Sequence, residues 1–65
     1  MAYKSKHTYE KISQETGFPV KTVMEIDDAT IGGVYTLGAL ARKYLSKPSD
    51  IGKVIDLLTE ADKIP

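Results

Sequence analysis

The sequence predicts an all-α domain, a small bundle of about four helices, and three observations support this fold class. Apolar residues recur every three or four positions through most of the chain, which is the spacing of one helix face. Glycine or proline interrupts this pattern near positions 17–19, 32–33 and 48. A chain of 65 residues can bury only one modest core. We therefore expect a flexible N-terminal arm over 1–7 and a single helical domain over 8–65.

The first helix is expected over 8–16. Thr8 is the candidate N-cap, Tyr9 and Ile12 fall on one face, and Gly17 supplies a C-terminal stop. The residues before Thr8 are mostly polar and carry too little apolar surface to offset the entropy cost of ordering them. This is why the segment before the helix is expected to be an arm.

The second helix is expected to follow Phe18-Pro19 and to end near Asp28. Pro19 lacks an amide donor, and this suits a proline to the start of a helix. The paired glycines Gly32-Gly33 form the clearest break in the chain, because each costs a helix about 1 kcal/mol relative to alanine. The apolar stripe of this helix consists of Val20, Val23, Met24 and Ile26.

Two further helices are expected after the glycine pair. Residues 34–36 could form one very short strand, and the Thr36 hydroxyl is suited to cap a third helix. Pro48 indicates the start of a last helix over about 49–61. The predicted buried face of the third helix is Leu37, Leu40, Ala41, Tyr44 and Leu45, and that of the last is Ile51, Val54, Ile55, Leu58 and Ala61.

The composition argues against catalysis and against bound metals or cofactors. The chain has no cysteine, and His7 is its only histidine, so the usual nitrogen and sulfur ligand sets for zinc are missing. Ser46 and Ser49 have no histidine near them in the sequence to act as a base. We expect no enzyme activity, no cofactor and no metal.

The hydropathy pattern indicates a cytoplasmic protein without a membrane partner. No apolar run approaches the roughly 20 residues that span a bilayer. The N-terminus lacks the apolar stretch of a signal peptide, and the chain has no cysteine for the disulfides of small secreted domains.

The charges cancel overall but are unevenly distributed. Nine basic and nine acidic residues count against nucleic-acid binding, because such domains usually carry a basic excess. Folding could nevertheless sort the charges into a basic and an acidic face, and a mixed solvated surface is the alternative. The basic stretch is opposed only by Asp50 and consists of Arg42, Lys43, Lys47 and Lys53.

The C-terminal half resembles a known DNA-binding motif. Thr36-Leu37-Gly38-Ala39-Leu40-Ala41 is followed by Ser46-Lys47-Pro48-Ser49 and by the stretch from Ile51 to Leu58-Thr59-Glu60-Ala61-Asp62-Lys63-Ile64. This order resembles the helix-turn-helix of winged-helix and MarR-like bacterial regulators. Leu45 stands at the turn position usually given to glycine, and Asp62 replaces a glycine near the end. No sequence for a β-wing follows, so we expect the wing to be absent.

This resemblance implies a recognition helix over about 49–61 that enters the major groove of duplex DNA. Lys47, Ser49, Asp50 and Lys53 would face the bases, while Arg42 and Lys43 would lie toward the phosphates. Such small modules usually bind as dimers. A simple αα-hairpin that buries an apolar seam would give the same packing pattern without DNA contact.

The N-terminal half resembles the same motif over Ile12 to Ile26, with Gly17 in the turn. Its outward face carries more acid than base, so this half suits a protein partner better than DNA. The residues expected to contact such a partner are Val20, Lys21, Met24 and Glu25.

Two hypotheses follow from these patterns. The first is a small DNA-binding regulator that acts as a homodimer through its last helix. The second is a protein-interaction module, an adaptor or inhibitor, with a helix-turn-helix-like bundle and no DNA binding. The net charge of zero and the acidic outward face of the second helix favour the second hypothesis.

Overall fold

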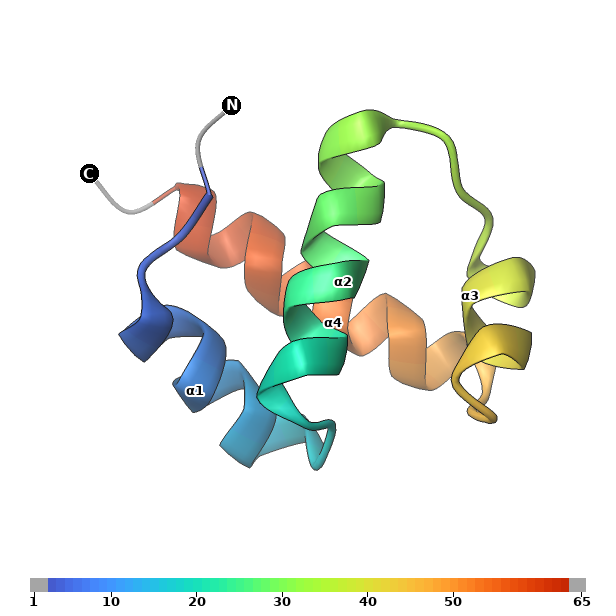
Figure 1. Cartoon of the computed structure of the whole chain (residues 1–65), viewed down its shortest axis with the longest axis horizontal. Helices are drawn as coiled ribbons and strands as arrows, with labels where there is room; N and C mark the ends of the chain where they lie inside the picture. The colour runs from blue at the N-terminus through green and yellow to red at the C-terminus, as the bar shows by residue number, and fades with distance from the viewer. Residues whose placement is uncertain (1–2, 64–65) are drawn as a thin grey trace.

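The computed structural model describes residues 3–63 and contains four helices over this range, with no strand (Figure 1). The prediction of an all-α bundle is therefore confirmed. The short strand expected near 34–36 is wrong, because these residues form an irregular connection. The helices are α1 (Lys6–Thr16), α2 (Val20–Gly32), α3 (Leu37–Lys43) and α4 (Pro48–Asp62).

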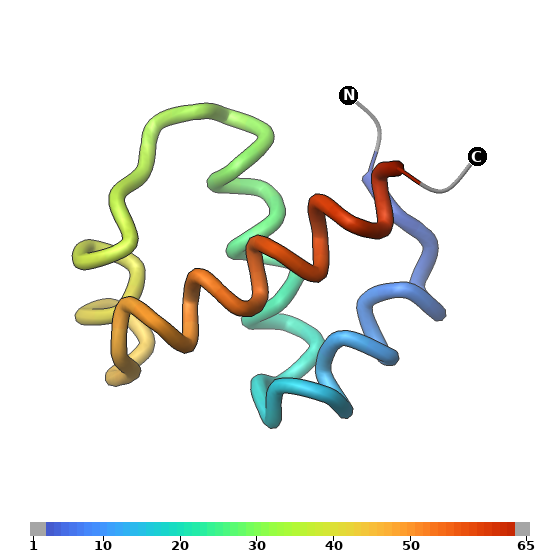
Figure 2. Tube along the Cα trace, turned by 180° about the vertical axis from the view of Figure 1, so that it is seen from behind, coloured from blue at the N-terminus to red at the C-terminus, as the bar shows by residue number. Residues whose placement is uncertain are grey.

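Helix α4 is the element on which the others pack. It crosses the molecule behind α2 and contacts α1, α2 and α3, whereas α3 packs mainly against α4 (Figures 1 and 2). The shortest principal axis of the molecule measures 17 Å. All four helices carry exposed residues, so each keeps one side in solvent.

The core is built from apolar side chains that the helical spacing brings to one side of each helix. All four helices contribute, and α4 contributes three residues. The core residues are Tyr9, Ile12, Val23, Ile26, Leu40, Ala41, Ile51, Val54 and Leu58. Each belongs to the helix to which the sequence pattern assigns it.

Helix α1 begins earlier than expected because Ser5, rather than Thr8, is its N-cap. The Ser5 hydroxyl accepts a hydrogen bond from the Thr8 amide at 3.3 Å. Lys6 and His7, expected in the arm, lie in the helix. Both Ser5 and Thr8 are good capping residues, so the sequence alone does not choose between them.

Helix α2 ends one turn later than Asp28, at Gly32. The Thr30 hydroxyl donates to the Asp27 carbonyl at 2.7 Å, and Gly33 closes the helix with a φ of 75°. At the expected end of the helix, Asp27 is buried and the neighbouring Asp28 is exposed.

A buried polar network around Asp27 joins the N-terminal segment to the bundle. The Asp27 carboxylate accepts from the Tyr9 hydroxyl at 2.5 Å and from Lys4 Nζ at 3.1 Å. Lys4 Nζ also contacts Asp62 at the end of α4 at 3.0 Å, and the Lys4 amide donates to the Tyr9 hydroxyl at 3.1 Å. Residues 4 and 5 are therefore held against the domain.

This network raises the pKa values of Tyr9 and Lys4. Burial, and then the hydrogen bond to Asp27, raises the pKa of Tyr9. Burial alone would lower the pKa of Lys4, but its hydrogen bonds to Asp62 and Asp27 outweigh this effect and raise it. Folding therefore favours neutral Tyr9 and charged Lys4.

The α3–α4 connection is a tight turn in which Leu45 takes a left-handed conformation with a φ of 54°. The Ser46 amide donates to the Ala41 carbonyl at 2.8 Å, and the Leu45 amide donates to the Arg42 carbonyl at 3.4 Å. This is the Schellman pattern of helix ends, whose left-handed position is usually glycine. The expectation that Leu45 is buried is wrong, because the side chain is 95% exposed.

The capping predictions for the last two helices are confirmed. The Thr36 hydroxyl accepts from the Ala39 amide at 3.1 Å at the start of α3. Pro48 is the first residue of α4, and the Asp50 carboxylate accepts from the Lys47 amide at 3.3 Å. Helix α4 extends one residue beyond the predicted 49–61 at each end.

We predict that Leu45→Gly stabilises the fold by about 1 kcal/mol, because glycine adopts the left-handed conformation without the cost paid by other residues. Leu45→Ala is the matched control. It removes the exposed side chain but keeps the Cβ atom, so its stability should stay close to that of the original chain. Urea denaturation at low protein concentration measures both effects. Equal stabilisation by the two substitutions would contradict the assignment of strain to the backbone.

We predict that Asp27→Ala destabilises the fold by about 3 kcal/mol, because it leaves the buried Lys4 and Tyr9 groups without their shared acceptor. Asp28→Ala removes the neighbouring, exposed carboxylate and should cost less than about 1 kcal/mol. Thermal and urea unfolding followed by circular dichroism compares the two. Similar losses of stability for both variants would show that the buried Asp27 carboxylate stabilises the fold no more than the exposed Asp28 carboxylate does.

Candidate functional site

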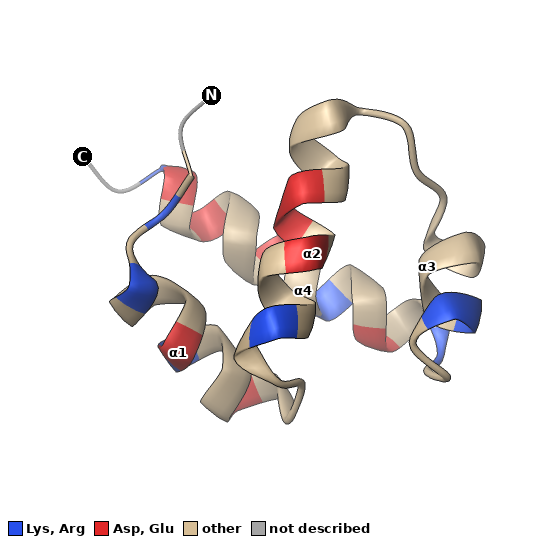
Figure 3. Cartoon of the chain, viewed as in Figure 1, with Lys and Arg blue, Asp and Glu red and all other residues tan. Residues whose placement is uncertain are grey.

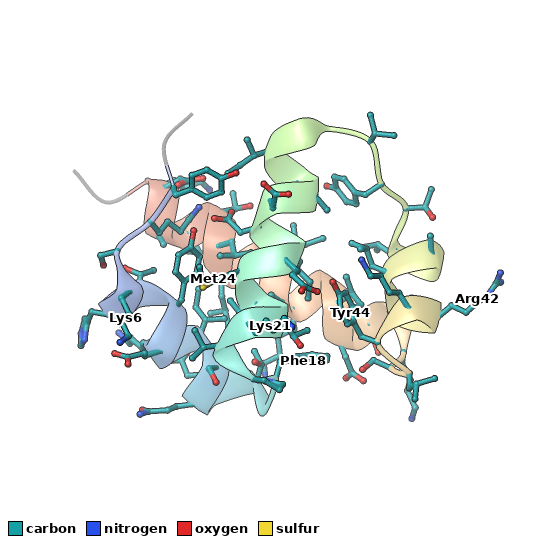
Figure 4. The ribbon with its side chains drawn as sticks, in the orientation of Figure 1. Lys6, Phe18, Lys21, Met24, Arg42 and Tyr44 are labelled. Atoms are coloured by element: carbon teal, nitrogen blue, oxygen red, sulfur yellow. The ribbon has the colours of Figure 1, made fainter. Side chains whose placement is uncertain are left out.

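The six residues expected to contact DNA lie around the α3–α4 corner. Arg42 and Lys43 are in the last turn of α3, and Arg42 points away from the bundle (Figure 4). Lys47 precedes α4, and Ser49, Asp50 and Lys53 lie in its first two turns. All six are exposed. The structure therefore groups these residues at one end of the molecule.

The charge of α4 argues against its insertion into DNA. Lys53 is the only cation between Pro48 and Asp62, against four carboxylates at Asp50, Asp56, Glu60 and Asp62. All five charged residues are exposed, while the opposite side of α4 is covered by the other helices. A helix that enters the major groove needs cations toward the phosphates, so the open side of α4 has the wrong charge balance.

The four residues expected to contact a protein partner lie together in one shallow groove of about 790 Å³. We call it the α2 groove. Val20, Lys21, Met24 and Glu25 come from the first two turns of α2 and line it. Figure 4 labels Lys21 and Met24 on this helix. The other lining residues are Tyr3, Asp28, Ala29 and Lys43.

The apolar part of the α2 groove is partly open to solvent. Met24 is 46% exposed and Tyr3 is 62% exposed, while Val20 and Ala29 are half-buried and pack against the core. Methionine is flexible and polarisable, so it adapts to partners of different shape. The groove therefore offers apolar contact area that the fold itself leaves in solvent.

Tyrosine hydroxyls hold both carboxylates of the groove in place. The Tyr44 hydroxyl donates to Glu25 at 2.6 Å from the corner that follows α3, and the Tyr3 hydroxyl donates to Asp28 from the N-terminal segment. Each hydroxyl uses one acceptor position of a carboxylate that can accept several hydrogen bonds. Glu25 and Asp28 are thus oriented and still able to bind a donor from outside.

Lys43 connects the groove to the α3–α4 corner. Its Nζ lies 5.4 Å from the centre of the Tyr44 ring, a cation–π contact, and the same lysine lines the α2 groove. The resemblance to DNA-binding regulators places Lys43 only toward DNA phosphates. Its place beside α2 results from the packing of the corner, for which no local sequence signal exists.

The burial of Tyr44, and then its hydrogen bond to Glu25, raises the pKa of Tyr44 to about 12. Figure 4 shows this tyrosine between α2 and the α3–α4 corner. The neutral hydroxyl is therefore part of the folded state throughout the physiological range. The contact joins the groove to a part of the molecule that otherwise packs mainly on α4.

A second, smaller hollow of about 440 Å³ lies between α1 and α4. Ile12, Leu57 and Ala61 contribute its apolar side chains, and charged residues including Lys11 and Glu60 surround them. None of the ten residues predicted to contact DNA or a protein partner lines this hollow. The four residues expected to contact a protein partner line the α2 groove and not this hollow.

Neither a metal site nor a membrane span is found in the part of the chain that the structure describes. Over residues 3–63, no three histidine, cysteine or carboxylate side chains are placed to hold a metal ion. No helix in this range is long and apolar enough to cross a membrane. Comparisons of the chain with protein-family models, curated proteins and solved structures gave no match.

We predict that the fold loses stability as the pH rises from 10, the ordinary pKa of tyrosine, to about 12, the value for Tyr44. The folded state holds the Tyr44 proton more tightly than the unfolded state, so its contribution is complete below pH 10 and is lost through this window. Tyr44→Phe should cost about 1 kcal/mol at neutral pH and show a smaller loss above pH 10. Urea denaturation at a series of pH values measures both.

The raised pKa values of Tyr9 and Lys4 act in the same direction, so the Tyr44→Phe variant should keep part of the alkaline loss. A Tyr44→Phe variant with the same pH profile as the original chain would contradict the contribution of Tyr44.

Proposed function

We propose that this chain is a protein-interaction module that binds a partner protein in the α2 groove. The observation that carries this proposal is that the residues predicted to contact a partner line one groove. The sequence predicts Val20, Lys21, Met24 and Glu25 on the outward face of a helix, and the groove contains all four. A groove with open apolar side chains and oriented charges is typical of a protein-binding surface.

The chemistry of the groove defines the partner segment that it suits. The apolar contribution of Met24, Val20 and Tyr3 favours a partner that inserts one or two apolar side chains. Glu25 and Asp28, held by tyrosines, favour basic residues on their side of the groove. Lys21 and Lys43 also line the groove, which therefore carries both signs of charge. We infer a short segment with an apolar tip and basic neighbours.

DNA binding is the second candidate function, and the grouping of Arg42, Lys43 and Lys47 at one corner favours it. The adjoining helix α4 would then have to lie in the major groove. Its one cation against four carboxylates makes this docking electrostatically unfavourable. The charge of α4 is the reason why the protein-interaction function is preferred.

Peptide selection tests the protein-interaction function directly. We expect a random peptide library, selected on the immobilised chain, to yield peptides with an apolar side chain flanked by lysine or arginine. Met24→Lys should weaken their binding at least about tenfold, because it places a cation among apolar and basic partner groups. Gln14→Lys is the matched control, since it adds the same charge at an exposed position of α1. Fluorescence anisotropy measures both affinities.

Two results would contradict this function. One is a set of selected peptides whose affinity is the same for the original chain and for Met24→Lys. The other is tight binding to duplex DNA that weakens steeply with salt and is lost in a Lys47→Glu, Lys53→Glu double variant. The second result would support the DNA-binding candidate instead.

A further inference from the structure

Leu45 combines two features that are costly to the chain on its own. Its backbone is left-handed, a conformation that glycine adopts more readily, and its side chain is 95% exposed. The leucine therefore adds backbone strain to the turn and almost no burial to the core. Such a combination indicates that Leu45 contacts another molecule.

The surroundings of Leu45 are basic. Arg42, Lys43 and Lys47 lie within three positions of it in the same tight turn, and all three are exposed. Arg42 accepts a backbone hydrogen bond from Leu45 through its carbonyl, so the two residues are held close together. We call Leu45 and these three cations the Leu45 knob. The knob has an apolar tip and basic neighbours.

Part of the α2 groove has the complementary chemistry. Its apolar surface comes from Val20, Met24 and Tyr3, and its carboxylates are Glu25 and Asp28. Two lysines, Lys21 and Lys43, also line it, so the cations of the knob fit only its carboxylate side. Figure 3 shows the acidic stretch of α2 and the basic residues of the α3–α4 corner as separate regions of one molecule. The partner segment inferred above for the groove is therefore present in the chain itself.

The knob does not occupy the groove of its own molecule. Leu45 is almost completely exposed and is absent from the groove lining, whereas Lys43 belongs to both the knob and the groove. Knob and groove are therefore neighbours on the surface. Two copies related by a two-fold axis could each place a knob in the groove of the other, as in other isologous dimers.

We propose that two copies of this chain associate reciprocally, with the Leu45 knob of each copy in the α2 groove of the other. This inference rests on the proposed function, for which it names the partner. The net charge of zero means that no overall repulsion opposes the approach of two copies. Each contact would bury an apolar side chain and bring the cations of the knob near Glu25 and Asp28.

Sedimentation velocity over a concentration series tests the association. We expect the original chain to shift from monomer to dimer between about 10 µM and about 1 mM. Leu45→Gly and Met24→Lys should each weaken dimerisation at least about tenfold, one by removing the tip and the other by placing a cation in the groove. Val34→Gly is the matched control for the first, because Val34 is also exposed, at 91%, but is not part of the knob.

The Leu45→Gly variant separates this role from a structural one. It is expected to make the monomer more stable and the dimer weaker, which are opposite effects of one substitution. Mixing the two variants adds a complementation test, because Leu45→Gly keeps its groove and Met24→Lys keeps its knob. We expect cross-linking to trap a mixed dimer more readily than either variant dimer.

Three results would overturn the inference: a chain that stays monomeric over the whole series, a Leu45→Gly variant that dimerises like the original chain, or variants that show no complementation. If the chain is monomeric but selected peptides still bind in a Met24-dependent manner, this inference fails and the proposed function stands. If the peptides also bind without regard to Met24, both fail.

Discussion

The buried carboxylate of Asp27 is the constraint on which the arrangement of the helices depends. It lies in the middle of α2 and accepts hydrogen bonds from Tyr9 of α1 and from Lys4, which in turn reaches Asp62 of α4. A small bundle has little apolar area with which to fix the angles between its helices. Directional hydrogen bonds in a low-dielectric site supply that specificity, because an unpaired buried charge is very costly.

The position of α4 explains why a helix-turn-helix pattern does not by itself establish DNA binding. The same helix that would have to read bases also provides Ile51, Val54 and Leu58 to the core and contacts the three other helices. Only the exposed side of α4 is therefore left to contact DNA. That side is mainly acidic, so the geometry of the corner and the electrostatics of the helix suggest different functions.

Much of the fold was predictable because it depends on local periodicity and capping. The buried positions of α4, the Thr36 cap and the place of Pro48 all follow from spacing and from residue chemistry. The burial of Asp27 was not predictable, since a carboxylate at the centre of a helix is normally exposed and its partners come from distant positions. The left-handed turn at Leu45 was equally hidden, because leucine normally signals burial.

The part of the candidate site that α2 contributes was predictable, because it also depends on local periodicity. Helical spacing places Val20, Lys21, Met24 and Glu25 on one outward side of α2. Tyr3 and Lys43 reach the groove through the N-terminal segment and the α3–α4 corner, and a single sequence contains no signal for such tertiary placement.

The ion pair between Lys4 and Asp62 brings the two ends of the described chain together (Figure 1). Closely spaced ends are what permits one domain to be inserted into a surface loop of another protein, because the host chain is interrupted at a single point. This bundle could therefore be carried as a guest within a larger polypeptide, or have its ends joined and be opened elsewhere. The connection at 33–36, exposed and free of regular structure, is the natural place for the new opening.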